Sequence, residues 1–162
     1  MCYIHSIMQR HTHTHTHTHT HTLTLPLSNA HFIWYCAWLS LPSAIYAYSN
    51  PTSTHLAIIP ASVWATSLLY WRNPVRHSWR RTLDIATVLT GLSYNTYYAF
   101  RYTRNTSPTH FGVYAALIST SGMSFFLGVY LMHRGHIWPA TYAHASIHFL
   151  GNVANLVLYH GK

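Results

Sequence analysis

Residues 111–132 read FGVYAALISTSGMSFFLGVYLM, a run of apolar and small side chains without a single charge. An α-helix needs about 20 largely apolar residues to cross the hydrocarbon core of a bilayer. The flanking sequence extends the charge-free stretch to residues 105–133. This run therefore predicts a transmembrane helix, and it indicates the fold class of the whole chain.

The rest of the chain is equally poor in charge. Only 6% of the 162 residues are Asp, Glu, Lys or Arg, against about 25% in an ordinary soluble domain. Hydrophobic residues make up 49% of the chain and aromatic residues 15%, which argues against both a soluble domain and general disorder. We expect an all-α, polytopic membrane helix bundle with about five transmembrane helices, at residues 31–48, 55–71, 83–102, 111–132 and 138–159.

Proline residues and short connections shape this bundle. Pro42 and Pro60 lie inside the first two predicted spans, so we expect either span to be kinked. The connections between the spans are short, which predicts that successive helices are antiparallel neighbours.

The net charge of +8 would ordinarily suggest a nucleic-acid partner. Here four of the nine cations fall within residues 72–81, between two apolar spans. Basic loops of this kind follow the positive-inside rule. We therefore expect the protein to lie in a lipid bilayer and to bind no nucleic acid. Six cations lie on the side of this loop and three on the other. Because the side with more cations is usually cytoplasmic, we expect the N-terminus in the cytoplasm.

The N-terminal sequence differs from the rest. Residues 11–22 repeat His-Thr six times, a low-complexity pattern that offers no side chains for a core. Such a histidine tract could also bind divalent ions. We expect two parts, a disordered His-Thr tail at residues 1–28 and a transmembrane helical bundle at residues 29–162.

Three ionisable side chains lie within the predicted spans: Asp84, His144 and His148. Ionisable groups inside a membrane are costly and usually mark a functional interior. His144 and His148 are one helical turn apart, about 40° around the axis, and Asn155 continues the same stripe. Asp84 begins a second polar stripe on the third helix. Because lipid offers these groups no partners, we expect the two stripes to face each other.

Ser67 lies near the end of the second span, at the depth predicted for Asp84, His144 and His148. A carboxylate, two imidazoles and a hydroxyl at one level could bind a divalent metal with an open position. Zinc suits the nitrogen ligands, and Asp84 could act as a ligand or as a base. Alternatively, Asp84 pairs with Arg80 or Arg81, and the histidines form hydrogen bonds between helices.

These residues resemble the CREST superfamily of membrane proteins, which includes alkaline ceramidases, adiponectin-type receptors and hemolysin III-like proteins. The similarity rests on Ser67, on the run from Arg80 to Asp84, and on His144-x-x-x-His148. It implies a zinc site for hydrolysing amide bonds in lipids, with Ser67 and Asp84 in catalytic roles and Asp84, His144 and His148 at the metal. The family has seven spans and a further histidine four residues after the serine, where this chain has Trp71.

The sequence thus leaves several functions open. The chain could be a metal-dependent hydrolase of a lipid amide, or a degenerate, non-catalytic member of the same superfamily. It could instead be a non-enzymatic membrane scaffold or assembly subunit that binds other membrane proteins, in which the polar residues only hold helices together. A transporter or proton relay along the polar stripe is a further alternative.

Overall fold

The computed structural model describes residues 25–161, and every secondary-structure element in this range is helical. The predicted disordered tail at residues 1–28 lies mostly outside the described residues. Leu25 is already buried, and the first helix starts two residues later. The elements are α1 (Leu27–Ala37), α2 (Ser40–Ser49), η1 (Thr54–Leu56), α3 (Ile58–Trp71), α4 (Trp79–Tyr98), η2 (Ala99–Thr103), α5 (Arg104–Thr106), α6 (Pro108–His133) and α7 (Ile137–His160).

The first predicted span forms two helices, α1 and α2, separated by a turn at Trp38 and Leu39. Pro42 lies in the first turn of α2, where its missing N–H leaves the carbonyl of Trp38 without an α-helical donor. That carbonyl instead accepts from the backbone N–H of Leu41, at 3.1 Å. Pro60 lies in the first turn of α3, where proline is tolerated and causes no break.

The third predicted span begins earlier than the sequence suggests. Ser78 caps α4, and its hydroxyl accepts from the backbone N–H of Arg81 at 3.3 Å. The helix therefore includes Arg80 and Arg81 in its first turn. At its other end α4 widens into the π-helical turn η2 before reaching α5.

A tight turn joins α6 to α7. Gly135 has a φ of 77°, a conformation that favours glycine because it has no Cβ. The N–H of Gly135 donates to Met132 O at 3.0 Å, and the N–H of His136 donates to Leu131 O at 2.9 Å. These two bonds form a Schellman motif, which turns the chain back so that α7 packs antiparallel along α6.

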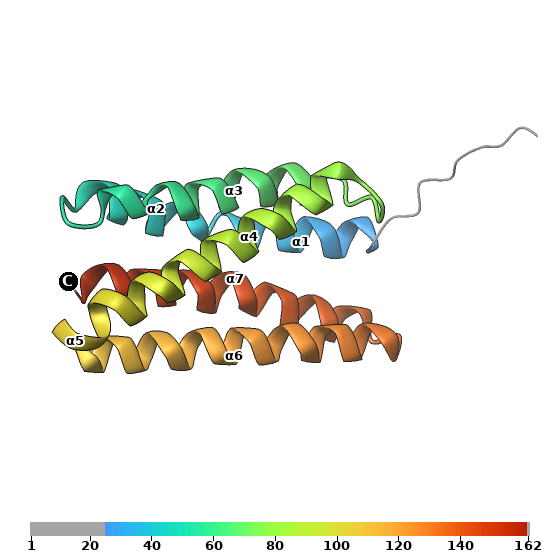
Figure 1. Ribbon diagram of the computed structural model, residues 1–162. Coiled ribbons are helices and arrows are strands. Elements are labelled where there is room, and N and C mark those ends of the chain that lie inside the picture. The colour runs from blue at the N-terminus through green and yellow to red at the C-terminus, as the bar shows by residue number, and fades with distance from the viewer. Residues whose placement is uncertain (1–24, 162) are drawn as a thin grey trace, which may run out of the picture.

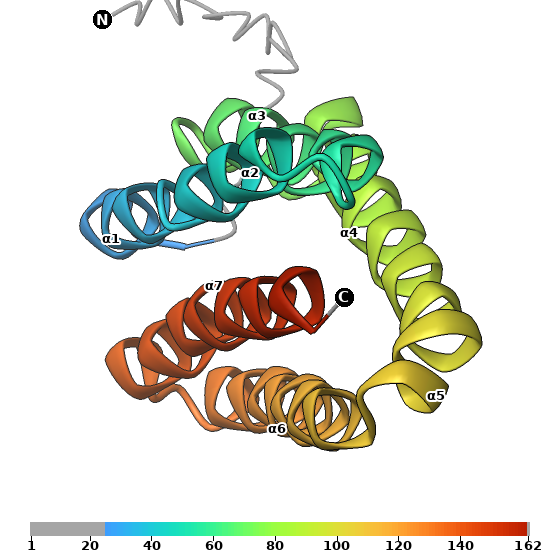
Figure 2. The ribbon, with the colours of Figure 1, turned by 90° about the vertical axis from the view of Figure 1, so that its left-hand side faces the viewer.

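Helix α7 is central to the arrangement. It contacts α6 on one side and α1 and α2 on another, while α3 packs against α4 as well as α1 and α2. Viewed along the helices, the other elements form an arc around α7 (Figure 2). Helix α4 runs obliquely from the α3 layer to the start of α6 (Figure 1).

The interior contains mainly small and polar side chains. Alanines such as Ala30, Ala47 and Ala154 are fully buried, whereas Phe126, Ile58 and many other large apolar side chains are exposed. Soluble domains bury their large apolar residues, and membrane bundles place small residues between their helices. One helix of the described chain, α6, is long and apolar enough to cross a membrane.

Candidate functional site

Asp84 is the first component of the candidate site. It begins the second turn of α4 and is buried, with 8% of its surface exposed. Ser67 on α3 donates its hydroxyl to Asp84 Oδ1 at 2.7 Å, and Thr66 donates to the same oxygen at 3.1 Å. The predicted meeting of Ser67 with Asp84 is therefore confirmed. Thr66 was missed, because its hydroxyl also bonds to backbone carbonyls of its own helix, which is its ordinary role.

The alternative expectation of an ion pair at Asp84 is not met. Among residues 25–161, neither Arg80 nor Arg81 forms a salt bridge with this carboxylate, whose partners are the hydroxyls of α3. Both arginines lie in the first turn of α4, and Arg81 is exposed.

His144 and His148 form the second component, on adjacent turns of α7. Their ring centroids are 5.6 Å apart, and the ring of His144 also packs edge-on against Trp71, at 4.9 Å. The Nε2 atom of His148 is buried without a hydrogen-bond partner in the described structure. A polar atom in this position costs free energy unless a partner is supplied.

Trp71 occupies the position where the CREST pattern has a histidine. It lies one turn after Ser67 at the end of α3, and it is buried, with its indole Nε1 lacking a hydrogen-bond partner among residues 25–161. An indole nitrogen is a donor without an available lone pair, so it cannot ligate a metal. The large ring beside His144 instead fills the space next to the imidazoles.

The described residues contain no group of three His, Cys, Asp or Glu side chains close enough to hold a metal ion. Catalytic zinc sites use three protein ligands and an open fourth position. The donor set formed by His144 and His148, with Trp71 beside them and Asp84 bonded to α3, does not match that requirement. We therefore derive no reaction step through zinc.

The polar stripes of α4 and α7 meet at the opposite end of the bundle. Asn95 on α4 donates its amide to Asn155 Oδ1 at 2.9 Å and to the Tyr159 hydroxyl at 3.4 Å. Here the prediction that the stripes face each other is correct. At the other end it is wrong, because Asp84 faces α3 and His144 packs against α3.

A third polar cluster joins the first helices to α7, and the sequence analysis missed it. Asn152 accepts from Ser43 at 2.7 Å and donates to Ser40 at 3.2 Å and to the carbonyl of His148 at 2.6 Å. Near the start of α7, Asn29 of α1 donates to Thr141 at 3.0 Å. The spacing of Ser40 and Ser43 on one helical face was the available signal.

Comparison with known proteins identifies no relative. No family model, no curated protein and no solved structure matches this chain. The CREST resemblance of Ser67, Asp84, His144 and His148 therefore stays a prediction from those residues.

Proposed function

We propose that this protein is a multi-pass integral membrane protein. The proposal rests on α6, a 26-residue helix about 39 Å long. Only 6% of its most apolar stretch is buried. A core helix of a soluble protein would be covered by neighbouring elements. The exposed apolar surface of α6 instead matches a hydrocarbon core about 30 Å thick.

The remaining spans are proposed from the lengths of the helices and from the bonds of their polar side chains. Helix α7, with 24 residues, and α4, with 20, are long enough to cross a bilayer. Their polar side chains Asn95, Asn152 and Asn155 bond inside the bundle. The broken pair α1 and α2 and the unit of η1 and α3 complete five crossings, with the N-terminus in the cytoplasm.

Topology can be tested by cysteine labelling. Cys2 and Cys36 are replaced by serine, and single cysteines are introduced at His77 and, for comparison, at Thr106. We expect an impermeant maleimide to label His77→Cys from the cytoplasmic side of sealed vesicles and Thr106→Cys only from the opposite side. Labelling of both from one side would contradict the crossing of α4. Release of the protein by alkaline carbonate would contradict membrane insertion altogether.

For the polar layer we propose a non-hydrolytic role, as in a degenerate CREST-like protein that acts as a membrane scaffold or assembly subunit. Ser67 and Asp84 join α3 to α4, and Trp71 and His144 join α3 to α7. These contacts hold three helices together at one level. The bilayer surrounds the protein, and other membrane proteins are the expected partners of its outer surface.

The metal-dependent hydrolase of a lipid amide is the second candidate. The observation that favours it is the buried Nε2 of His148, which has no hydrogen-bond partner in the described chain and could accept a metal or a proton. In this version Asp84 would turn from its hydroxyl partners on α3 to join His144 and His148 as a zinc ligand, and Ser67 would polarise the reacting group.

Metal analysis separates the two candidates. All proteins carry serine in place of the six histidines of residues 11–22, because that tract could bind metal independently. The scaffold role predicts equal zinc content with and without His144→Ala plus His148→Ala. A loss of about one zinc per chain in the double variant would favour the hydrolase.

Replacing Trp71 tests the CREST-like geometry directly. If Trp71 stands where the CREST pattern has a histidine ligand, Trp71→His should add about one zinc per chain. A further His144→Ala should remove that zinc again. The matched control is Trp64→His. It also places one histidine on α3, but at an indole that does not contact His144. Equal zinc gain by both variants would contradict the resemblance.

A further inference from the structure

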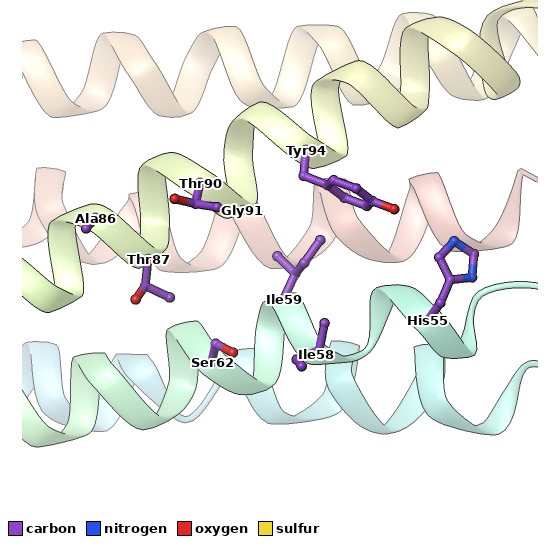
Figure 3. A pocket seen from close by; sticks show the side chains of 9 residues that line it. All are labelled: His55, Ile58, Ile59, Ser62, Ala86, Thr87, Thr90, Gly91 and Tyr94. Atoms are coloured by element: carbon purple, nitrogen blue, oxygen red, sulfur yellow. The ribbon is translucent and has the colours of Figure 1, made fainter.

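A pocket of about 490 Å³ opens between α3 and α4, and neither Asp84 nor its partners Ser67 and Thr66 line it. Figure 3 shows Ile58 and Ser62 on one helix and Thr90 and Tyr94 on the other, with His55 at one end. The volume lies within the range of small-molecule sites. The full lining is His55, Ile58, Ile59, Ser62, Ala86, Thr87, Thr90, Gly91 and Tyr94.

The lining combines apolar groups with hydroxyls and contains no Asp, Glu, Lys or Arg. In a bilayer, a pocket on the outer surface of two helices is filled by lipid. A ligand with a charged head would meet no opposite charge here. The composition therefore favours a neutral, largely apolar molecule with few polar groups.

The pocket hydroxyls are available for such a ligand. Within residues 25–161, the side-chain oxygens of Ser62, Thr87, Thr90 and Tyr94 form no hydrogen bond. By contrast, Thr66, like Thr120 and Thr141, donates to a backbone carbonyl four residues earlier. Hydroxyls without a partner facing hydrocarbon are unfavourable, and a ligand hydroxyl would give one of them a partner.

The shape of the pocket favours a flat ligand. At its floor, α3 and α4 approach so closely that a Cβ on Gly91 would lie 2.7 Å from Ile59 Cγ2. A shallow hollow lined by Leu89, Ser93 and Tyr97 adjoins the pocket on α4, and the two share Thr90 and Tyr94. Together they form one surface of β-branched, small and aromatic side chains.

The sequence of α4 adds a separate indication. Leu92, Tyr97 and Arg101 follow the spacing of a short, low-specificity pattern proposed for cholesterol contact. Tyr97 lies in the adjoining hollow, and Arg101 follows α4 in η2. The central tyrosine of the pattern therefore lies on this surface, whereas Leu92 and Arg101 line neither hollow.

We propose that the α3–α4 pocket binds a membrane sterol, whose rigid rings lie on this surface and whose hydroxyl bonds to Thr90, which lines both the pocket and the adjoining hollow. The proposal rests on the membrane insertion of the chain. It does not depend on whether the layer at Asp84 is catalytic.

The test uses the full chain reconstituted in phosphatidylcholine vesicles with a photoactivatable sterol. We expect crosslinks within residues 55–62 and 86–97, displaced by excess unlabelled sterol and not by excess diacylglycerol. Ala86→Trp, which fills the pocket, should reduce labelling to background. Ala65→Trp places the same ring on an exposed site of α3 outside the pocket and should label like the natural chain.

A milder variant covers the case in which Ala86→Trp fails to fold. Thr90→Val keeps the side-chain shape and removes one hydroxyl, so the apparent affinity for sterol should fall about fivefold. Unchanged affinity in Thr90→Val, displacement by diacylglycerol, or crosslinks mapped elsewhere would each overturn the proposal. A chain that resists carbonate extraction but is not labelled refutes sterol binding alone, whereas an extracted chain refutes membrane insertion.

Discussion

Helices α6 and α7 are neighbours of nearly equal length, 26 and 24 residues, yet they differ in how many of their side chains are buried. On α6 only Tyr114 and Ser121 are buried. On α7 the buried positions are spread over the whole helix. They are Ala140, Thr141, Ala145, Asn152, Ala154, Leu158 and Tyr159.

The difference in burial follows the distribution of polar side chains over the two helices. Helix α6 is apolar around most of its circumference and has few protein neighbours, so its side chains can face lipid. Helix α7 carries histidines and asparagines, which need hydrogen-bond partners that hydrocarbon lacks. It is therefore surrounded by α1, α2 and α6. Four substitutions test this difference between the two helices.

The largest effect is expected from a charge on the outer face of α6. Met123 lies near the middle of this helix and is 72% exposed. If this face contacts lipid, Met123→Lys should cost about 2.5 to 3.5 kcal/mol of insertion free energy. Glycosylation sites engineered at the two ends of α6 would measure the inserted fraction, with Met123→Leu as the control. Unchanged insertion of the lysine variant would show that this face meets water.

A smaller effect is expected inside the bundle at Asn152. Leucine at this position removes three hydrogen bonds and leaves the Ser40 hydroxyl without a partner, while Ser43 keeps its bond to the carbonyl of Ser40. Asn152→Leu should lower the free energy of unfolding by about 2 kcal/mol. Unfolding in mixed detergent micelles measures this value, compared with Phe149→Leu on the exposed face of α7. A more stable Asn152→Leu protein would contradict the assigned bonds.

Asn95 should contribute less, although it also bonds to α7. Its amide donates to Asn155 and Tyr159, but its buried Oδ1 has no partner in the described structure. Asn95→Leu removes the two bonds and also removes this unfavourable oxygen. We expect a loss of about 1 kcal/mol in the same unfolding assay. A loss larger than that of Asn152→Leu would reverse the proposed order of the two contacts.

The smallest effect is expected from exchanging one apolar group for another on α6. Phe126 is 72% exposed. If this face contacts lipid, leucine is solvated there as well as phenylalanine. Phe126→Leu should change the unfolding free energy by less than about 0.5 kcal/mol. A larger loss in a dilute reconstituted sample would mean that Phe126 packs against protein, for example a second copy of the chain.

The helices and the meeting of Ser67 with Asp84 could be predicted from the sequence. Long charge-free runs determine where helices form, and short loops place the end of α3 beside the start of α4. The partner of His144 could not be predicted in this way. Its contact with Trp71 depends on how α3 lies across α7, and helical periodicity shows only which residues share a face of one helix.

The break between α1 and α2 was partly predictable. Pro42 indicated a bend, but its position at Trp38 and Leu39 depends on the hydrogen bonds available around the proline. The role of Ser40 and Ser43 followed from that break, because it turns both hydroxyls toward Asn152. A straight helix over residues 31–48 would not have suggested this cluster.

The helical character of the chain and its lack of charge over most of its length can be read from the sequence, because local hydropathy and turn residues act within one segment. Which polar groups bond to one another depends on how the helices pack. Asp84 could have turned to an arginine, to a histidine or to Ser67, and each choice satisfies the same helical pattern. Because α4 runs obliquely, its start contacts Ser67 on α3 and its end contacts α7. A helix that crosses its neighbours at an angle contacts different partners along its length.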